Sequence, residues 1–392
     1  MFGPLALLGL IAFVFNLGGG LIAPAIPLYA RSLGADYWDL GLIGASHGLA
    51  FAALTIPLGR ASDRFGRRTL LLASGLAVAV AALCYVVSTR VAGLVVGKLV
   101  EAAGWAAFWP AIEAWAAEVF GRRAGTAMGV GYGAYAAAFV IGTGAAGFVM
   151  EAAGLRAPFV VYLVTATLAL GLVLAMPGSP ATAEPHHAAG RGARASILPA
   201  GDGEARRQRL LAYGTGFVYV FGLGTVLSFL PVYAADRGLS PRAVGLLLAG
   251  YWVARLLAAL VAGRISDRLG RRAVLVPAML VSAACGVLIG VPAGATALYA
   301  GTIGLGLTAG ACAPTCVGHI ADHVRAADRG IAMGLFEGAC GLSFLVSGLA
   351  GGRAAEALGP GVPYLMGAGL ALGWTAVLLR GLRSLPAIRP VG

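Results

Sequence analysis

Long apolar runs dominate the chain and are separated by short stretches of glycine, proline and charged residues. Each run has about 18 or more residues, enough for a helix to cross ~30 Å of hydrocarbon. Helices are the expected element, because an unpaired strand edge in lipid would leave backbone groups without hydrogen-bond partners. The pattern predicts twelve membrane-spanning helices, over residues 4–30, 39–58, 69–88, 91–115, 124–149, 157–176, 211–233, 241–262, 273–291, 295–319, 330–351 and 361–380.

Composition supports an all-α membrane protein. Of the 392 residues, 59% are hydrophobic and only 11% are charged, with a mean hydropathy of +0.87. A soluble chain carries about a quarter charged residues. The first apolar run does not resemble a cleaved signal peptide, because "MFGPLALLGL" has no basic start and the run continues to Ala30. We therefore interpret it as the first membrane helix.

The hydrophobic pattern stops between the sixth and seventh runs. Residues 177–208 are rich in proline, glycine and alanine and carry mixed charge, which is typical of a flexible linker. This predicts an N-terminal six-helix bundle over residues 1–176, the linker, and a C-terminal six-helix bundle over residues 209–392. His186 and His187 lie in the linker, but an isolated histidine pair rarely makes a metal site. We expect no metal and no cofactor.

The net charge of +12 is distributed unevenly across the predicted membrane. Of the 28 lysines and arginines, 20 lie on one side, 6 lie on the other, and Lys98 and Arg255 lie inside spans. The cations occupy short loops without a basic groove or interleaved aromatic residues, so they indicate topology rather than nucleic-acid binding. The positive-inside rule predicts a multi-pass protein of the plasma (inner) membrane with both termini in the cytoplasm.

The two halves repeat each other at an offset of 204 residues. The segment "GRASDRFGRR" at 59–68 returns as "GRISDRLGRR" at 263–272, and Glu118 corresponds to Asp322. Each half has six spans, so both halves have the same orientation in the membrane. Such a parallel repeat is typical of transporters whose two bundles rock about a central cavity.

The charged segment has the pattern G-x-x-x-D-R-x-G-R-R. Its residues in the first half are Gly59, Asp63, Arg64, Gly66, Arg67 and Arg68, and a second copy follows the eighth span. On these residues the sequence resembles the major facilitator superfamily, over nearly the whole chain outside the linker. The resemblance implies two pseudo-symmetric six-helix bundles, with helices 1, 4, 7 and 10 lining a cavity.

The charged segment predicts a cytoplasmic gate. We expect Gly66 to form a tight turn and Gly59 to allow close helix approach. The resemblance implies that Asp63 meets the start of helix 11. The resemblance also implies that Arg67 pairs with an acid at the inner end of helix 4, and the repeat points to that acid. We therefore expect two ion pairs, Arg67–Glu118 and Arg271–Asp322, which would break when the halves rock. The gate set consists of Gly59, Asp63, Arg64, Gly66, Arg67, Arg68, Glu118, Asp267, Arg271 and Asp322. The alternative is that these arginines only set topology.

Buried polar residues that break the repeat are the candidates for a substrate or proton site. A charge in the middle of a bilayer is costly and usually lines a wet cavity. The polar candidates and their counterparts in the other half are Asn16 (Val220), His47 (Tyr251), Lys98 (Thr302), Glu101 (Leu305), Arg255 (Phe51) and Glu337 (Tyr132).

Lys98 and Glu101 are three residues apart, so they share a helix face and can pair. Glu101 is the first candidate for a proton carrier, because its charge state depends on both its burial and this lysine. A static ion pair that braces the helix is the alternative. Arg255 and Glu337 lie at similar depth and either meet across the cavity or satisfy local groups. Arg255 either binds an anionic substrate or is structural.

Two tryptophans and a histidine complete the candidate site. Trp105 and Trp109 lie near Glu101 in sequence and either stack on an aromatic or cationic substrate or serve packing. His47 is either a second proton site or a hydrogen-bonded core histidine.

The predicted function is secondary transport by alternating access, with a small molecule and protons as partners and a monomer as the working form. We expect proton-coupled efflux of an amphipathic compound, as in drug–proton antiporters of the superfamily. Those antiporters tend to carry G-P-x-x-G-G in helix 5, whereas residues 142–147 read "GTGAAG". Uptake of a small organic, possibly anionic, solute by symport or facilitated diffusion is therefore the alternative. A receptor or a membrane enzyme is a more remote alternative function, because the sequence has no sensing domain, nucleophile–base pair or phosphate-binding loop.

Overall fold

The computed structural model describes residues 3–176, 203–291, 294–325 and 328–382. In this part of the chain there are twelve α-helices, each long and apolar enough to cross a membrane. They are α1 (Pro4–Ser32), α2 (Tyr37–Phe65), α3 (Arg67–Val87), α4 (Val91–Phe120), α5 (Ala124–Ala153), α6 (Ala157–Leu174), α7 (Gly203–Ala235), α8 (Pro241–Leu269), α9 (Arg271–Gly290), α10 (Gly294–Asp322), α11 (Arg329–Leu358) and α12 (Val362–Gly381). A 3₁₀ turn, η1 (Gly121–Arg123), joins α4 to α5.

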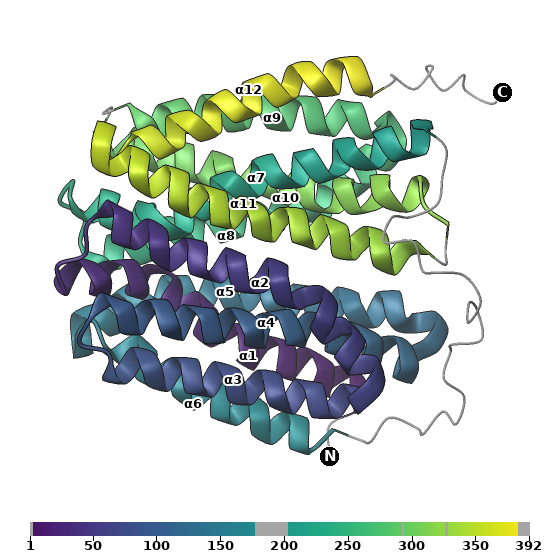
Figure 1. Cartoon of the computed structure of the whole chain (residues 1–392), viewed down its shortest axis with the longest axis horizontal. Helices are drawn as coiled ribbons and strands as arrows, with labels where there is room; N and C mark the ends of the chain where they lie inside the picture. Colours follow the sequence, from purple (N-terminus) through teal and green to yellow (C-terminus); the bar gives the residue numbers. More distant parts are fainter. Residues whose placement is uncertain (1–2, 177–202, 292–293, 326–327, 383–392) are drawn as a thin grey trace.

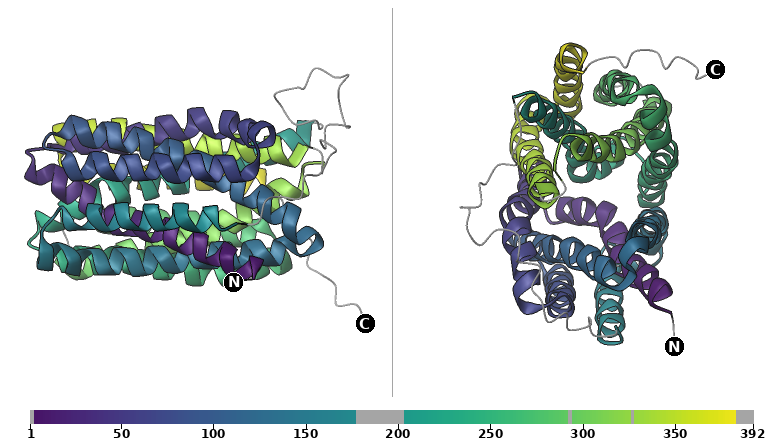
Figure 2. Two further views of the ribbon diagram at one scale, coloured as in Figure 1. Left: turned by 90° about the horizontal axis from the view of Figure 1, so that it is seen from below. Right: turned by 90° about the vertical axis from the view of Figure 1, so that its right-hand side faces the viewer.

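The helices form two bundles that lie side by side, α1–α6 and α7–α12 (Figure 1). Viewed along the helices, the bundles occupy separate halves of the molecule (Figure 2). Each bundle has an even number of spans, so α1 and α7 begin, and α6 and α12 end, at the same end of the molecule. We call this end the terminal face and the opposite end the distal face.

The bundles meet mainly through α2 against α11 and α5 against α8 (Figure 1). Glycines permit this close approach. A Cβ atom on Gly348 of α11 would overlap the backbone of Gly41 and Ala45 of α2. A Cβ atom on Gly147 of α5 would overlap the backbone of α8 at Arg242. Small residues thus let the helix backbones pack closely. This matters in a membrane, because apolar side chains contact lipid as favourably as they contact another helix.

Some helices extend beyond the apolar runs that predict them. Helix α4 continues to Phe120, and α7 begins at Gly203, inside the expected linker. Hydropathy detects only the part of a helix that lies in lipid, whereas a helix continues with polar residues into the aqueous layer. The remainder of the expected linker, with His186 and His187, lies outside the described residues.

The glycines of the repeated charged segment have different roles. Gly66 between α2 and α3 and Gly270 between α8 and α9 both have φ of 88°, a conformation that favours glycine. The predicted tight turn is therefore confirmed. The expectation for Gly59 is wrong, because a Cβ atom there would lie 3.9 Å from Pro110, at ordinary contact distance.

Candidate functional site: a central cavity

A cavity of about 980 Å³ lies between the two bundles. It receives side chains from α1, α2, α4, α5, α7, α8, α10 and α11, so four helices beyond the expected set of 1, 4, 7 and 10 contribute. Seven of the polar and aromatic candidates line it: His47, Lys98, Glu101, Trp105, Trp109, Arg255 and Glu337. The tertiary structure therefore brings together residues that are up to 290 positions apart in the sequence.

Asn16 does not belong to this cavity. Its side chain is fully buried, and its Nδ2 donates a hydrogen bond to the Ala12 carbonyl one turn earlier in α1, at 2.7 Å. Asn16 has no polar counterpart in the second half, but its side chain lies inside the first bundle and not in the cavity. The selection of Asn16 from sequence is therefore corrected.

Contacts between the bundles close the cavity at the distal face. The Tyr37 hydroxyl at the start of α2 donates to Asp236 Oδ2 just beyond α7, at 3.0 Å. Arg31 lies 3.6 Å from the same carboxylate. The Arg242 N–H at the start of α8 donates to Glu151 Oε1 near the end of α5, at 3.1 Å. These polar links stand at the distal end of the tight α2–α11 and α5–α8 contacts.

The cavity spans much of the distance between the two faces, and its distal lining includes Leu40, three residues after the start of α2. Toward the terminal face its lining includes Gly129 and Met333, each within two turns of the start of α5 and α11, and Leu260 near the end of α8. Among the residues whose side chains the structure describes, every hydrogen bond and ion pair between the bundles lies at the distal face. In the described part of the chain, the polar links between the bundles therefore stand at the distal end of the vestibule.

A polar cluster on the first bundle surrounds Glu101. Lys98 Nζ lies 2.9 Å from Glu101 Oε2, as the three-residue spacing predicts. The Tyr85 hydroxyl of α3 donates to the same oxygen. The Glu101 side chain is 3% exposed and that of Lys98 is 19% exposed, so the lysine lies between the carboxylate and the open space. The pair is neutral overall, which reduces the cost of placing two charges inside the protein.

His47 of α2 faces the same space from beside the interface with α11. Its ring stacks on Phe51 and meets the edge of Phe344, at centroid distances of 6.0 and 5.7 Å. Its Nδ1 is buried and has no partner among the described residues. The hydrogen bond expected for a core histidine is thus missing at this nitrogen.

A second group of charges lies nearer the terminal face. Glu113 of α4 accepts a hydrogen bond from the Tyr132 hydroxyl of α5. Glu337 of α11 is within electrostatic range of Glu113 and of Arg255 on α8. No ion pair joins Arg255 to Glu337, so the direct meeting that the sequence allowed does not occur. Two carboxylates and one guanidinium therefore face one volume without neutralising each other by contact.

Arg255 is held by an aromatic ring. Its guanidinium lies 4.9 Å from the centroid of Trp252, one turn earlier in α8. Such a cation–π contact compensates part of the cost of removing the charge from water. Its Nη1 is buried and has no hydrogen-bond partner among the described residues, which leaves a donor available to a ligand.

Aromatic side chains form the wall between the two polar groups. Trp109 stacks on Tyr132 with the rings 13° from parallel and 5.1 Å apart. Trp105 meets the edge of Phe139, which in turn contacts Trp252 across the α5–α8 interface at 4.3 Å. Rings of this kind present flat, polarisable surfaces to an aromatic or cationic solute.

The repeated charged segments form two matching ion-pair networks at the terminal face. Arg67 Nε lies 2.9 Å from Glu118 Oε1, and Arg271 Nη2 lies 2.9 Å from Asp322 Oδ2. Both predicted ion pairs are therefore present. Arg271 also pairs with Asp267 at 2.7 Å.

These pairs lie within one bundle each, because α3 and α4 both belong to the first bundle and α9 and α10 to the second. By themselves they brace the ends of helices rather than join the bundles. Arg68 has a similar role, since it donates to the Leu174 carbonyl at the end of α6, where the helix dipole favours a cation. Arg64 lies over the ring of Phe65. The side chain of Asp63, the expected link to α11, lies outside the described residues.

Sequence reasoning missed Glu113 and Tyr85. The rule that selected the other candidates also selects Glu113, because its counterpart at an offset of 204 is Val317. Tyr85 offers no such signal, since tyrosine is common in apolar helices and only the packing of α3 against α4 places its hydroxyl on Glu101. Among the described residues, no three histidine, cysteine or acidic side chains are grouped as a metal site would require.

Two six-helix bundles around a charged cavity, joined by polar links at the distal face, are typical of a membrane transporter. The model of the Major Facilitator Superfamily matches residues 8–240 and 212–391. The chain therefore belongs to this superfamily, whose members and structural neighbours here are transporters rather than enzymes.

Similarity to individual relatives is partial. An uncharacterized MFS-type transporter of Methanocaldococcus jannaschii is 30% identical over 38% of each chain. Multidrug resistance protein 2 of Bacillus subtilis is 24% identical over 66% of each, and the quinolone resistance protein NorA of Staphylococcus aureus is 27% identical over 30% of each. The matched stretches thus span less than two thirds of these relatives.

Solved structures match over nearly the full length. A single-residue mutant of the nucleoside transporter NupG has a TM-score of 0.80 at 13% identity, covering 97% of this chain and 100% of its own. A POT family transporter in complex with 5-aminolevulinic acid has a TM-score of 0.78 at 14% identity, covering 96% and 95%. The human organic anion transporter MFSD10 has a TM-score of 0.69 at 18% identity, covering 96% and 98%. At these identities the likeness shows the fold alone.

Proposed function

We propose that this transporter exports a cationic amphipathic compound in exchange for protons by alternating access. One observation carries the proposal: Glu113 and Glu337 face the cavity among stacked aromatic rings, and neither is in an ion pair among the described residues. A cationic solute would bind between the two carboxylates, with its apolar part against Trp109 and the neighbouring rings. Two of the relatives are named as resistance proteins for drugs, which agrees with this substrate class.

Glu101 is the proposed proton carrier. Its carboxylate is buried, lies beside the cavity, and is held by one cation and one hydroxyl. Proton binding at Glu101 would release Lys98, and rearrangement of the bundles would change the exposure of both groups. In this proposal the proton site at Glu101 and the solute site at Glu113 and Glu337 lie at different depths along the cavity.

The terminal face is proposed to lie in the cytoplasm and the membrane to be the plasma (inner) membrane. The 20 cationic residues on this side of the predicted topology support the orientation. The structure is then open to the cytoplasm and closed to the outside. We propose a monomer as the working form, since one chain supplies twelve membrane-spanning helices and both bundles around the cavity.

The test is transport in proteoliposomes with a defined pH gradient. A fluorescent lipophilic cation should move against its concentration gradient only when an inward proton gradient is imposed, and the protons should flow in the opposite direction. Movement that is independent of the imposed gradient, with no proton flux, would contradict proton coupling. A panel of neutral and anionic solutes of equal size tests the substrate class in the same assay.

A second candidate function rests on Arg255. Its buried Nη1 has no partner among the described residues, so it is suited to the carboxylate of a small organic anion entering by symport or facilitated diffusion. MFSD10 is named as an organic anion transporter, and the fold is therefore compatible with such a solute. Accumulation of the anions rather than the cations in the panel, lost in Arg255→Gln, would favour this function.

A further inference from the structure

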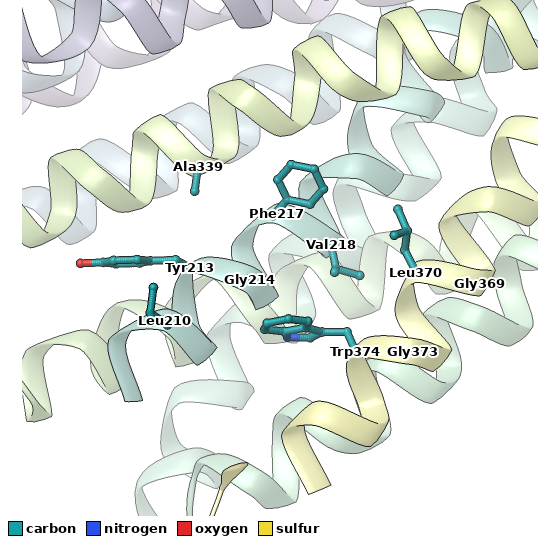
Figure 3. A pocket seen from close by; sticks show the side chains of 10 residues that line it. All are labelled: Leu210, Tyr213, Gly214, Phe217, Val218, Ala339, Gly369, Leu370, Gly373 and Trp374. Carbon is teal, nitrogen blue, oxygen red and sulfur yellow. The ribbon is translucent and has the colours of Figure 1, made fainter. Parts of the chain in front are cut away.

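A second cavity lies on the outside of the C-terminal bundle, away from the transport site. It has a volume of about 680 Å³ and is lined by α7, α11 and α12. Figure 3 shows its lining residues, which are Leu210, Tyr213, Gly214, Phe217, Val218, Ala339, Gly369, Leu370, Gly373 and Trp374. None of them lines the central cavity. We call this cavity the outer groove.

Small residues open the outer groove and a tryptophan shapes it. A Cβ atom on Gly369 or Gly373 of α12 would meet nothing within 4 Å, so these positions leave empty space. Trp374 lies flat against Gly214 of α7, and its Nε1 donates to Thr215 Oγ1 at 2.9 Å. The indole is therefore fixed in place as one wall of the groove (Figure 3).

The groove runs along much of one leaflet, whose hydrocarbon is about 15 Å thick, half of ~30 Å. Its lining on α7 runs from Leu210 to Val218, which corresponds to ~12 Å along the helix axis at 1.5 Å per residue. The polar atoms of its side chains are few, and Leu210 and Leu370 are 53% and 39% exposed. An apolar, outward-facing hollow at this depth in a membrane span matches an acyl chain.

Arginines stand at the terminal-face end of the groove. Arg206 and Arg207 are four and three residues before Leu210, so they continue the same side of α7. Arg380 is seven residues after Gly373 on α12, and its carbonyl accepts a hydrogen bond from Arg207 at 3.1 Å. The cations therefore gather where the two helices meet. Glu204 is the acid that accompanies them, 3.5 Å from Arg207.

We infer that the outer groove is a binding site for an anionic phospholipid, with one acyl chain against Trp374 and the phosphate at Arg206, Arg207 and Arg380. The apolar hollow accommodates any lipid chain, whereas the cluster selects a negative headgroup, because juxtamembrane cations attract anionic lipids. The site is independent of the transported solute, since the outer groove shares no lining residue with the central cavity.

The experiment uses the full-length protein in nanodiscs that contain brominated phosphatidylglycerol or brominated phosphatidylcholine at equal mole fraction. Bromine quenches nearby tryptophans, and the part due to Trp374 is obtained by difference from Trp374→Phe. We expect several-fold stronger quenching of Trp374 by the anionic lipid. Neutralisation of the cluster (Arg206→Gln, Arg207→Gln, Arg380→Gln) should abolish this preference, and filling the groove (Gly369→Leu, Gly373→Leu) should reduce quenching by both lipids.

Matched controls separate a site from general attraction to the protein. Arg60→Gln, Arg123→Gln and Arg325→Gln together remove the same charge from exposed positions predicted on the same face, and should leave the preference intact. Gly171→Leu on α6 adds a side chain at a position where a Cβ atom would meet nothing within 4 Å, and should leave quenching of Trp374 unchanged. Equal quenching by the two lipids in wild type, or loss of the preference in the control triple variant, would overturn the inference. Native mass spectrometry of bound phosphatidylglycerol provides a second readout for variants with altered fluorescence.

Discussion

Single side chains in the cavity differ in how their charge is compensated. Glu101 has a lysine and a tyrosine within hydrogen-bond distance, whereas Glu113 has a tyrosine alone. Arg255 has an aromatic ring and one donor without a partner among the described residues. A charged group with a partner of opposite charge is stable while the cavity is empty. A charged group without such a partner gains the most favourable interaction energy when a ligand binds to it. This difference separates the proposed proton site from the proposed solute site.

Replacement of Glu101 by Gln tests the proton site. We expect the variant to fold and to exchange the cation down its gradient, but to lose accumulation driven by the pH gradient, because the amide cannot take up a proton in this range. Transport with and without the gradient measures the difference. In Glu101→Gln the partly buried Lys98 loses its carboxylate partner. The double variant Lys98→Met with Glu101→Gln removes this lysine as well and serves as the control for stability.

A structural role for the pair gives the opposite outcome. If Lys98 and Glu101 only brace α4, then Glu101→Gln should lower the melting temperature while the surviving protein still responds to the pH gradient. That result would remove the proton role. Glu356→Gln, at an exposed position near the distal end of α11, is a matched control for loss of one carboxylate.

The second residue-scale prediction concerns the acidic pair of the solute site. Glu113→Gln and Glu337→Gln should each weaken binding of a lipophilic cation by about tenfold or more, since a hydrogen bond to a charged group contributes about 1.5–3 kcal/mol. Binding is measured by the fluorescence of the cation with purified protein. Tyr132→Phe should have a smaller effect, because it removes only the hydroxyl that orients Glu113. Unchanged affinity in both acid variants would exclude this site for the cation.

At the scale of helices, glycines determine how the bundles meet. The α2–α11 contact is tight at Gly41 and Gly348, whereas Gly338, three turns earlier on α11, has no atom within 4 Å of an added Cβ. Glycine is thus required for packing at position 348 but not at position 338. The closure at the distal face depends on tightly packed glycines such as Gly348.

Substitution of Gly348 by Leu should prevent closure at the distal face. The added side chain overlaps the α2 backbone, which cannot move aside as a flexible side chain would. We expect at least a tenfold loss of transport at normal expression, measured in proteoliposomes. Gly338→Leu, on the same helix, should retain transport; equal losses in the two variants would show that leucine is harmful to α11 for another reason.

At the scale of the whole molecule, one chain is divided into two rigid bundles that share a vestibule. The distal face is closed by Tyr37, Arg31 and Asp236, and the internal ion pairs hold each bundle together at the terminal face. In the proposed alternating-access cycle, the distal contacts open and the terminal side closes. The proposal therefore requires that the two bundles move against each other during transport.

A reversible cross-link across the distal face tests this requirement. In Arg31→Cys with Asp236→Cys, a short bifunctional methanethiosulfonate should join the bundles and reduce transport to the background of empty liposomes. Reduction should restore it. Arg31→Cys alone, treated with the same reagent, controls for modification of one thiol and of the native cysteines, all of which lie within spans. Full transport by the cross-linked protein would contradict rocking of the two bundles.

Much of the fold could be predicted from sequence, for a reason particular to membranes. Lipid offers no hydrogen bonds, so the backbone must form helices, and the thickness of the hydrocarbon sets their length. The repeat then predicted the partners of Arg67 and Arg271 correctly, because equivalent loops in two equivalent bundles have equivalent neighbours. Asn16 shows the limit of the same logic, since a residue can break the repeat and still lie within a bundle.

The sequence by itself determined twelve helices, their division into two parallel halves, and the charged turns at Gly66 and Gly270. Hydrophobicity, chain length and repeat spacing are properties of the chain alone, and the bilayer converts them into spans. Only the tertiary structure decided that Glu113 shares a cavity with Glu337, that Tyr85 bonds to Glu101, and that the distal face is the closed one. Helices in lipid are apolar on most sides, so their rotation and docking follow from close packing at particular glycines and rings, which no local pattern specifies.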